Sequence, residues 1–319
     1  MRSGKMPIIA VIAILTALLA TPVQARAESR ACPGCPLPVP LQGWHPTGAL
    51  RHQFQLQGVP DRFCSTGGYN THVSGPSFLG ETVAPEVYAI DLYADDGACP
   101  NYKPGTLNRD AVNSLHAQGK RAIAYISIGA WESYRPDAWK FKAFDRQCGG
   151  CLMGNDYFGS DDSRWLNLNN NRGQRDFLYR VMAARILKAK KAGFDAVYYD
   201  ITDGFNNDTG FHISARTQLL YNSTLLNMAH LAGLAAGLNY DILQVKQLEP
   251  YEEFHIDESC WVFSECYYFD PVREAHKPVF EIEYVSNPAD VCPAANKLSN
   301  FLTVFKSFDL FDFPWEPCR

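Results

Sequence analysis

The chain has 319 residues, of which 46% are hydrophobic, and it carries a formal net charge of -5 at pH 7. This length suffices for one large domain or two small ones. The acidic balance leaves no basic surface of the kind that nucleic acids require, so we expect no nucleic-acid partner.

Residues 1–27 predict a secretory signal peptide. Arg2 and Lys5 give a basic start, residues 8–20 form an apolar run, and small residues at cleavage spacing follow it. The run is too short for a membrane span, which argues against an uncleaved anchor. No other stretch is long and apolar enough to cross a bilayer. We therefore expect a secreted, extracellular protein without stable membrane insertion.

The cysteines support export, because an even number outside the signal segment predicts disulfides in an oxidising compartment. They are Cys32, Cys35, Cys64, Cys99, Cys148, Cys151, Cys260, Cys266, Cys292 and Cys318. Two pairs have CxxC spacing, so a four-thiolate zinc site is the alternative. We favour disulfides, and we expect no metal and no cofactor. Cys260 and Cys266 are close enough in sequence to bridge locally, and the remaining pairings stay open.

Residues 28–50 are rich in Pro, Gly and Cys and predict an N-terminal arm, followed by one folded domain over residues 51–319. Apolar or alternating runs predict strands at 52–56, 87–93, 121–128, 196–199, 234–240, 253–258, 278–284 and 303–309. Helical patterns lie at 107–118, 174–192, 214–232, 242–248, 268–276 and 289–300. Eight strands with helices between most of them predict a (β/α)₈ TIM barrel, and an open doubly wound α/β sheet is the alternative. Residues 133–172 form a long polar and aromatic excursion.

Acidic residues stand at the ends of several predicted strands. Asp200 follows a buried apolar run and begins a polar loop, and Asp91, Asp257, Glu258 and Glu283 have similar positions. In a barrel these ends meet on one face, where close carboxylates raise one another's pKa. One protonated and one ionised carboxyl group are what a glycosidase needs. The alternative is that Asp200 caps the next helix or pairs with an arginine.

Aromatic side chains lie on or just after these strands and could stack on sugar rings; the alternative is that they fill gaps in the core and loops, which we favour for Tyr88. They are Tyr88, Tyr125, Trp131, Tyr134, Tyr199 and Tyr240. No group of histidines and acids has the spacing of metal ligands.

A series of short motifs runs in order along most of residues 44–285. They are QFQLQG (53–58), VYAIDLY (87–93), YISIGAWE (125–132), RPD (135–137), WLNL (165–168), GFD (193–195), DITDGF (200–205), NDTGF (207–211), QLLYN (218–222), ESC (258–260), EC (265–266) and FEIEY (280–284). The ordered set resembles glycoside hydrolase family 114, the endo-α-1,4-polygalactosaminidase family of (β/α)₈ barrels.

The resemblance implies that Asp200 and Glu258 are the catalytic pair, with Asp200 as nucleophile and Glu258 as acid/base by analogy with other α-galactoside-cleaving barrels. Retention of configuration would need the two carboxyl groups about 5 Å apart. Asp91, Asp203 and Glu283 would bind substrate or hold the pair. The implied partner is a polysaccharide, a galactosamine polymer that is cationic when deacetylated and that a ring of acids would attract. We expect the protein to act as a monomer.

The sequence departs from the family pattern after the fifth predicted strand. The family usually has Gly-Leu-Lys-Asn there, whereas this chain has Asn239 and Tyr240 in place of the Lys and Asn, and Asp257 stands where Asn is more common. These changes leave the expected catalytic pair intact, but they leave open which substrate the protein acts on. A glycosidase for a different polysaccharide, and a carbohydrate-binding barrel with little or no turnover, therefore stand as alternatives. The substrate-binding residues expected from strand ends, aromatic positions and resemblance are Asp91, Tyr125, Trp131, Asp203, Asn239, Tyr240, Asp257 and Glu283.

Overall fold

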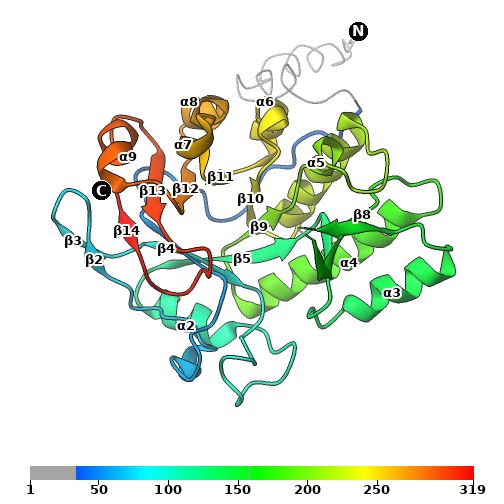
Figure 1. Cartoon of the computed structure of the whole chain (residues 1–319), viewed down its shortest axis with the longest axis horizontal. Coiled ribbons are helices and arrows are strands. Elements are labelled where there is room, and N and C mark those ends of the chain that lie inside the picture. Colours follow the sequence, from blue (N-terminus) through cyan, green and yellow to red (C-terminus); the bar gives the residue numbers. More distant parts are fainter. Residues whose placement is uncertain (1–33, 158) are drawn as a thin grey trace, which may run out of the picture.

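The computed structural model describes residues 34–157 and 159–319 (Figure 1). The predicted signal peptide and Cys32 lie outside the described residues. Residues 36–39 of the predicted arm lie along the barrel, where the Asn227 amide donates to the Leu37 carbonyl and accepts from the Val39 N–H, both at 2.8 Å. The Tyr251 hydroxyl donates to the Pro36 carbonyl at 2.8 Å. Residues 36–39 of the arm are therefore docked on the outside of the folded domain.

The core of the protein is a barrel of parallel strands arranged in sequence order. The strands are β1 (His52–Gln55), β4 (Val87–Asp91), β5 (Arg121–Ser127), β9 (Ala196–Asp200), β10 (Ala235–Asn239), β11 (Phe254–Glu258), β12 (Val279–Glu283) and β13 (Phe301–Phe305). Each pairs in parallel with the next. Their residues are mostly buried because helices or loops cover the outside of the sheet while the barrel interior is filled. The predicted α/β barrel is confirmed.

The C-terminal segment connects the last strand of the barrel to the first. The short strand β14 (Glu316–Pro317) pairs antiparallel with β13. The Trp315 indole N–H donates to the His52 carbonyl at 2.9 Å, and the Lys306 ammonium donates to the Gln53 side chain at 3.1 Å. Burial lowers the pKa of Lys306 to about 7.

The helices cover the barrel unevenly, as Figure 1 shows. They are α2 (Arg109–Ala117), α3 (Ala138–Gln147), α4 (Gln174–Ala192), α5 (Ala215–Leu231), α6 (Val245–Leu248), α7 (Cys260–Phe263), α8 (Asp270–Glu274) and α9 (Pro288–Ala295). Ser214 caps α5 by accepting the Thr217 N–H at 3.1 Å, and Gly193 ends α4 with a φ of 97°. Among the described residues, no helix combines the length and the apolar character needed to cross a membrane.

Two parts of the chain differ from the expected elements. The excursion expected at 133–172 contains α3 and a small antiparallel sheet of β6 (Ala130–Glu132), β7 (Met153–Tyr157) and β8 (Ser160–Leu166). The last barrel strand ends at Phe305, earlier than expected, because a turn closed by the Leu310 N–H and the Ser307 carbonyl follows it. The remaining short elements are η1 (Cys64–Thr66), β2 (Gly75–Pro76), β3 (Thr82–Val83), η2 (Gly204–Asn206), η3 (Ile242–Gln244), η4 (Glu249–Tyr251) and η5 (Cys266–Phe269).

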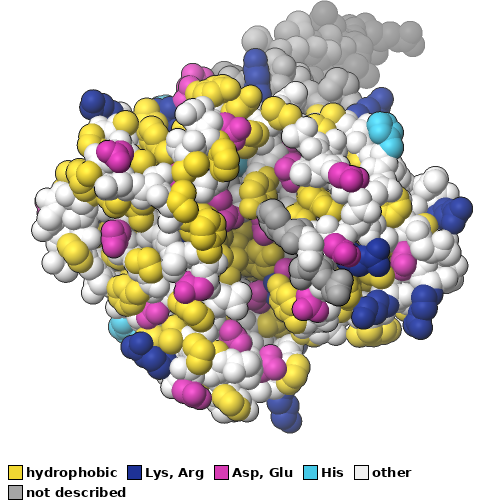
Figure 2. Space-filling model, in the orientation of Figure 1, with side chains coloured by type: hydrophobic (Ala, Val, Ile, Leu, Met, Phe, Trp, Pro, Cys, Tyr) yellow, Lys and Arg dark blue, Asp and Glu magenta, His cyan; other side chains and the backbone are white. Residues whose placement is uncertain are grey.

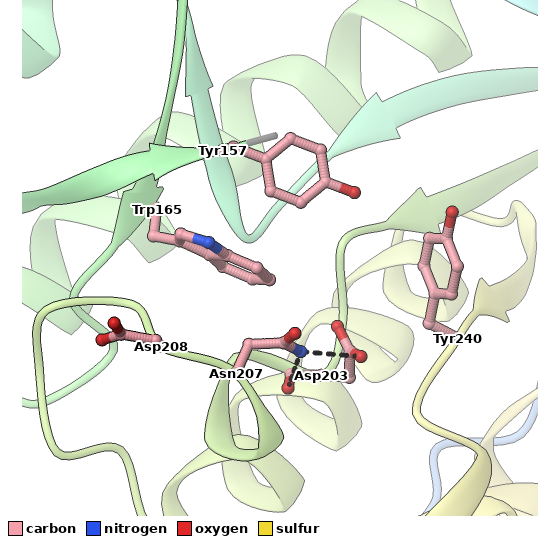
Figure 3. Close-up of a pocket in the computed structure, with 6 residues that line it drawn as sticks. All are labelled: Tyr157, Trp165, Asp203, Asn207, Asp208 and Tyr240. Atoms are coloured by element: carbon pink, nitrogen blue, oxygen red, sulfur yellow. Dashed lines mark hydrogen bonds between the residues drawn. The ribbon is translucent and has the colours of Figure 1, made fainter. Parts of the chain in front are cut away.

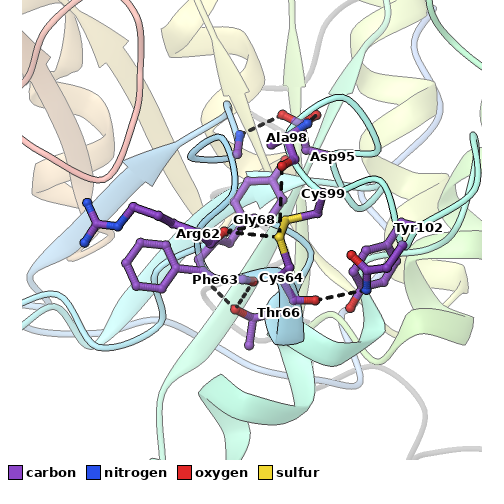
Figure 4. Close-up of a disulfide and its surroundings, with 12 residues drawn as sticks. Arg62, Phe63, Cys64, Thr66, Gly68, Asp95, Ala98, Cys99 and Tyr102 are labelled. Carbon is purple, nitrogen blue, oxygen red and sulfur yellow. Dashed lines mark hydrogen bonds between the residues drawn. A yellow bond between two sulfur atoms is a disulfide. The ribbon is translucent and has the colours of Figure 1, made fainter.

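Disulfides fasten the connections around the barrel. The described pairs are Cys64–Cys99, Cys148–Cys151, Cys260–Cys266 and Cys292–Cys318. Cys35 is also disulfide-bonded. Figure 4 shows how Cys64–Cys99 joins the segments that follow β1 and β4. The predicted disulfides and the local Cys260–Cys266 bridge are confirmed, and the Cys148–Cys151 pair is a disulfide and not part of a zinc site.

We expect Gly129→Ala to destabilise the fold by about 2 kcal/mol or more, because a Cβ there would lie 1.8 Å from the Ile201 carbonyl oxygen. Denaturant unfolding would measure the loss. Gly75→Ala is the control, since its nearest neighbour would lie at an ordinary 3.7 Å. Equal stability of the two variants would contradict the close approach of Gly129 to the Ile201 carbonyl.

Candidate active site

Three neighbouring strands end in the polar side chains that form the centre of the site. Asp200 ends β9, Asn239 ends β10 and Glu258 ends β11. The Asn239 amide nitrogen lies 3.2 Å from Asp200 Oδ1 and 2.6 Å from Glu258 Oε1. Because both oxygens contact the same nitrogen, they can be no more than about 6 Å apart. The two carboxyl groups expected to act together therefore do lie together, on either side of an amide.

The proximity of the carboxyl groups changes their acidity. Burial, and then the charge of Glu258, raise the pKa of Asp200 to about 8. Burial also raises the pKa of Glu258, whereas hydrogen bonds from Tyr284 and Asn239 oppose this rise. Two buried carboxylates at this distance repel each other, so near neutral pH the pair retains a proton.

Tyr284 binds the second carboxyl oxygen of Glu258. This residue follows β12, and its hydroxyl donates to Glu258 Oε2. The ring of Phe308 stacks on Tyr284 with centroids 4.5 Å apart. Glu258 therefore receives hydrogen bonds at both oxygens, and these bonds stabilise its ionised form.

The backbone turns sharply after each of the three central residues. Ile201, Tyr240 and Ser259 all have left-handed conformations, with φ of 59°, 63° and 71°. This conformation is strained for residues other than glycine, above all for a β-branched isoleucine, and persists only where the surroundings impose it. At Asp200 the turn brings the Ile201 N–H to 2.9 Å from Oδ1. At Asn239 it brings the Tyr240 N–H to 2.9 Å from the side-chain oxygen, which aims the amide nitrogen at the carboxyl groups.

A buried ionic network lies beside the pair. Arg135 donates to Asp91 Oδ2 and to Glu132 Oε2, both at 2.6 Å. The hydroxyls of Tyr125 and Tyr134 donate to Glu132 Oε1 at 3.2 and 2.6 Å. Burial raises the pKa of Asp91 even against the charge of Arg135, whereas Glu132, although buried, has a lowered pKa because Arg135 and Tyr134 stabilise its charge. The carboxylate of Asp91 is therefore fixed by its ion pair with Arg135.

A pocket of about 360 Å³ opens on one side of the pair (Figure 3). Tyr157 and Trp165 from the small antiparallel sheet face Tyr240 across it. Asp203, Asn207 and Asp208 complete the lining. Burial and the charges of Asp200, Asp203 and Glu258 raise the pKa of Tyr157, because this side of the pocket lies near those carboxyl groups.

A second pocket, of about 570 Å³, includes the Arg135 network. Its lining comprises Leu56, Gln57, Tyr69, Asp91, Tyr93, Ala94, Asp95, Asp96, Gly97, Pro104, Gly105, Tyr125, Tyr134, Arg135, Pro136 and Leu310. Burial and the charges of Glu132 and Asp200 raise the pKa of Tyr125, so this pocket also borders the pair. Figure 2 shows a hollow in the middle of this face with acidic side chains in and around it, whereas the lysines and arginines lie mainly toward the edge.

Most of the residues expected to bind substrate lie at these pockets or between them. They are Asp91, Tyr125, Asp203, Asn239 and Tyr240. The structure also brings in residues that were not expected at the site from the sequence, namely Tyr157, Trp165, Arg135, Glu132 and Tyr284. Several of these fall within the ordered motifs, so the motifs themselves were the signal that could have identified them.

Three expected substrate-binding residues lie elsewhere, which corrects the prediction for them. Asp257 and Glu283 are buried on the outer face of the barrel, since neighbouring residues of a strand point to opposite sides. Asp257 accepts the Cys260 N–H at 3.1 Å, and Glu283 accepts the Trp261 N–H at 2.9 Å. Trp131 is a core residue whose indole N–H donates to the Ala138 carbonyl at 3.2 Å.

A barrel with two closely spaced carboxyl groups at its strand ends and pockets beside them has the architecture of a carbohydrate-cleaving hydrolase. The sequence profile of glycoside-hydrolase family GH114 matches residues 38–318, and the chain belongs to this family. The family predicted from the motifs, and the assignment as a glycoside hydrolase, are therefore confirmed.

Solved structures show the same fold. The structure of Ega3 from Aspergillus fumigatus in complex with galactosamine matches with a TM-score of 0.69 and 24% sequence identity, over 88% of this chain and 99% of that chain. The glycoside hydrolase domain of PelA from Pseudomonas aeruginosa matches with a TM-score of 0.53 and 12% identity, over 83% and 97% of the two chains. Among curated proteins no match was found.

We expect Tyr284→Phe to raise the pKa of Glu258 further, since a hydrogen bond to the charged form is lost. The acidic limb of the pH profile of kcat/KM would move to higher pH. The control is Tyr102→Phe, which removes an exposed hydroxyl donor to Asp110. Superimposable profiles for wild type and Tyr284→Phe would contradict the assigned role of this hydroxyl.

Proposed function

We propose that this protein is a secreted endo-glycosidase that cleaves α-1,4-linked galactosamine-containing polysaccharide with retention of configuration. The observation that carries the proposal is the contact of Asp200 and Glu258 with one amide nitrogen of Asn239. The resulting limit of about 6 Å between two of their oxygens fits the short separation of retaining enzymes better than the wider gap that an inverting enzyme leaves for water.

The proposed reaction has two steps. In the first step Asp200 attacks the anomeric carbon, the glycosidic C–O bond breaks, and Glu258 gives its proton to the leaving oxygen. In the second step Glu258 removes a proton from water, whose oxygen displaces Asp200 from the anomeric carbon. Each carboxyl group ends the cycle in the state in which it began.

The proton must be redistributed before this reaction starts. The donors on Glu258 favour its ionised form, and the raised pKa leaves the proton on Asp200 in the free protein. The proposed roles need the opposite arrangement. A cationic sugar beside Asp200 favours the ionised form of this carboxyl group, and its proton then passes to Glu258, which needs it for the first step.

The charge around the pair supports a cationic substrate. Asp203 and Asp208 line the smaller pocket, which has no lysine or arginine in its described lining. In the larger pocket Arg135 is already bound by Asp91 and Glu132. The galactosamine of the Ega3 complex is a sugar of this cationic kind. A galactosamine polymer would bring positive charge into a site whose own charge is largely uncompensated.

The two pockets support internal cleavage of a chain. They border the pair from different sides and carry aromatic walls, Tyr157, Trp165 and Tyr240 in one and Tyr69, Tyr125 and Tyr134 in the other. Such walls stack on the apolar faces of sugar rings. A polymer lying through both pockets would be cut within its length.

Secretion is supported by the predicted signal peptide and by the disulfides. The monomeric state and the domain boundaries remain predictions.

Incubation with partly deacetylated α-1,4-linked galactosaminan, followed by mass spectrometry, tests the activity. We expect short oligomers from the wild type, and a loss of at least about a thousandfold in Asp200→Asn and Glu258→Gln, because each carboxyl group takes part in bond making. Asp290→Asn and Glu274→Gln make the same chemical changes at exposed positions and should retain activity. Binding without products in the wild type would favour a carbohydrate-binding role, and products only from other polysaccharides would change the substrate.

The activity should have a bell-shaped pH dependence. The raised pKa of Asp200 keeps the shared proton on the pair up to about pH 8, and kcat/KM should fall as the pH rises through that value and the acid is lost. On the acidic side it should fall when the second carboxyl group is protonated. A rate that stays constant from neutral pH to well above pH 8 would show that no such shared proton is needed.

Azide can separate the two roles on a substrate with a good leaving group. If Asp200 is the nucleophile, Glu258→Ala should form an α-glycosyl azide through the covalent intermediate, and Asp200→Ala should form the β-azide by direct displacement. The reverse pattern would exchange the two roles while leaving the pair intact.

A further inference from the structure

Two successive residues after β10 have a strained backbone. Tyr240 and Asp241 are left-handed, with φ of 63° and 49°, and neither is glycine. Such a conformation costs free energy and persists only where contacts impose it. The turn brings the Tyr240 N–H to 2.9 Å from the side-chain oxygen of Asn239 and so aims the amide nitrogen of Asn239 at the catalytic pair. The contacts that hold this turn therefore determine how well the pair is aligned.

His255 on β11 contacts the carbonyl group of Tyr240. Its side chain is on the outer face of the barrel, because it lies two residues before Asp257 on the same strand. Its Nε2 lies 3.2 Å from the Tyr240 carbonyl oxygen, and its Nδ1 lies 3.0 Å from a carboxyl oxygen of Glu252. Both side chains of this His–Glu pair are buried. Phe269 packs against the imidazole with ring centroids 4.9 Å apart, so the ring is fixed from a third side.

The partners of the imidazole determine where its hydrogens lie. The Tyr240 carbonyl can only accept a hydrogen bond, so this contact requires a hydrogen on Nε2. On the other side, Glu252 either accepts from Nδ1–H as a carboxylate or donates its own proton to Nδ1. Both arrangements keep the hydrogen on Nε2. Although burial opposes it, the charge of Glu252 and its hydrogen bond raise the pKa of His255, and the charge of Asp257 adds to this effect.

A second His–Glu pair of the same chemistry lies elsewhere in the structure. Nε2 of His230 lies 2.8 Å from a carboxyl oxygen of Glu253, and its Nδ1 lies 2.7 Å from the carbonyl oxygen of Val39. This pair holds the N-terminal arm and not a residue of the site. It therefore offers a matched control for effects that come only from losing a buried His–Glu pair.

We propose that His255 is a positioning residue for the catalytic pair, held in place by Glu252. Its Nε2–H binds the Tyr240 carbonyl, this contact fixes the turn after β10, and the turn aims the Asn239 amide at the two carboxyl groups. His255 lines neither pocket. Only the ring of Tyr240 faces the smaller pocket, as Figure 3 shows. This role rests on the proposed function, because it acts through the catalytic pair.

The test compares two variants that both lack the charge of Glu252. In Glu252→Gln the amide can hydrogen-bond Nδ1 of a neutral imidazole, whose hydrogen stays on Nε2 against the Tyr240 carbonyl. We expect its acidic limb in the pH profile of kcat/KM to stay at the wild-type position. Adding His255→Phe to Glu252→Gln keeps a ring at this place but removes the donor.

The double variant should lose the alignment of the Asn239 amide. Glu258 then loses a hydrogen bond to its charged form, so the acidic limb should move to higher pH. We expect kcat to fall about tenfold, which corresponds to the loss of one hydrogen bond to a charged group. The control, Glu253→Gln with His230→Phe, should lower the Tm without moving the limb. Identical limbs in the two Glu252 variants, or an equal shift in the control, would overturn the proposal.

Nitrogen-15 NMR of the full chain separates this proposal from the proposed function, because it needs no substrate. The imidazole of His255 should carry a hydrogen on Nε2 throughout about pH 5 to 8, and a bare Nε2 would sink the proposal even in an active enzyme. This measurement on the wild type decides if the double variant fails to fold. The side-chain amide signal of Asn239 should move in the double variant and not in Glu252→Gln, whether or not galactosaminan is cleaved. Failure to cleave galactosaminan, with these signals as expected, would refute the substrate alone.

Discussion

One amide group holds the site together. Asn239 contacts a carboxyl oxygen of Asp200 and one of Glu258, and it can do so because three successive parallel strands end at the same level of the barrel. The left-handed backbone after each of these residues supplies the N–H groups that aim Asp200 and Asn239. The raised pKa of Asp200 follows from keeping two acids this close in a buried place, and the close packing of Gly129 against the Ile201 carbonyl lies directly after Asp200.

The positions of the strands could be predicted from sequence because buried parallel strands are short apolar runs with polar residues at their ends. The run before Asp200 is a clear case, and β9 ends at that residue. The side to which a strand-end acid points is harder to predict. Asp257 and Glu258 are neighbours, so they point to opposite faces, and the sequence alone does not say which face is the interior.

Other parts of the site depend on contacts between distant segments. Tyr157 and Trp165 come from an excursion without a clear period, and only its folding into a small antiparallel sheet brings them opposite Tyr240. Ion pairs with two acids from different parts of the chain, Asp91 and Glu132, position Arg135. The departure at Asn239 could be seen in the sequence, but its contact with both carboxyl groups could not, because that contact needs the register of β9, β10 and β11.

In the proposed mechanism Asp200 and Glu258 act as one closely spaced pair in a retaining cleavage of a galactosamine polymer. Proton NMR of the first products formed by the wild-type protein tests it most directly, because the anomer that appears before mutarotation reports the stereochemistry. We expect the α-anomer to appear first and Asp200→Asn to form no product. Initial formation of the β-anomer would contradict retention, and with it the role given to the short distance between the two carboxyl groups.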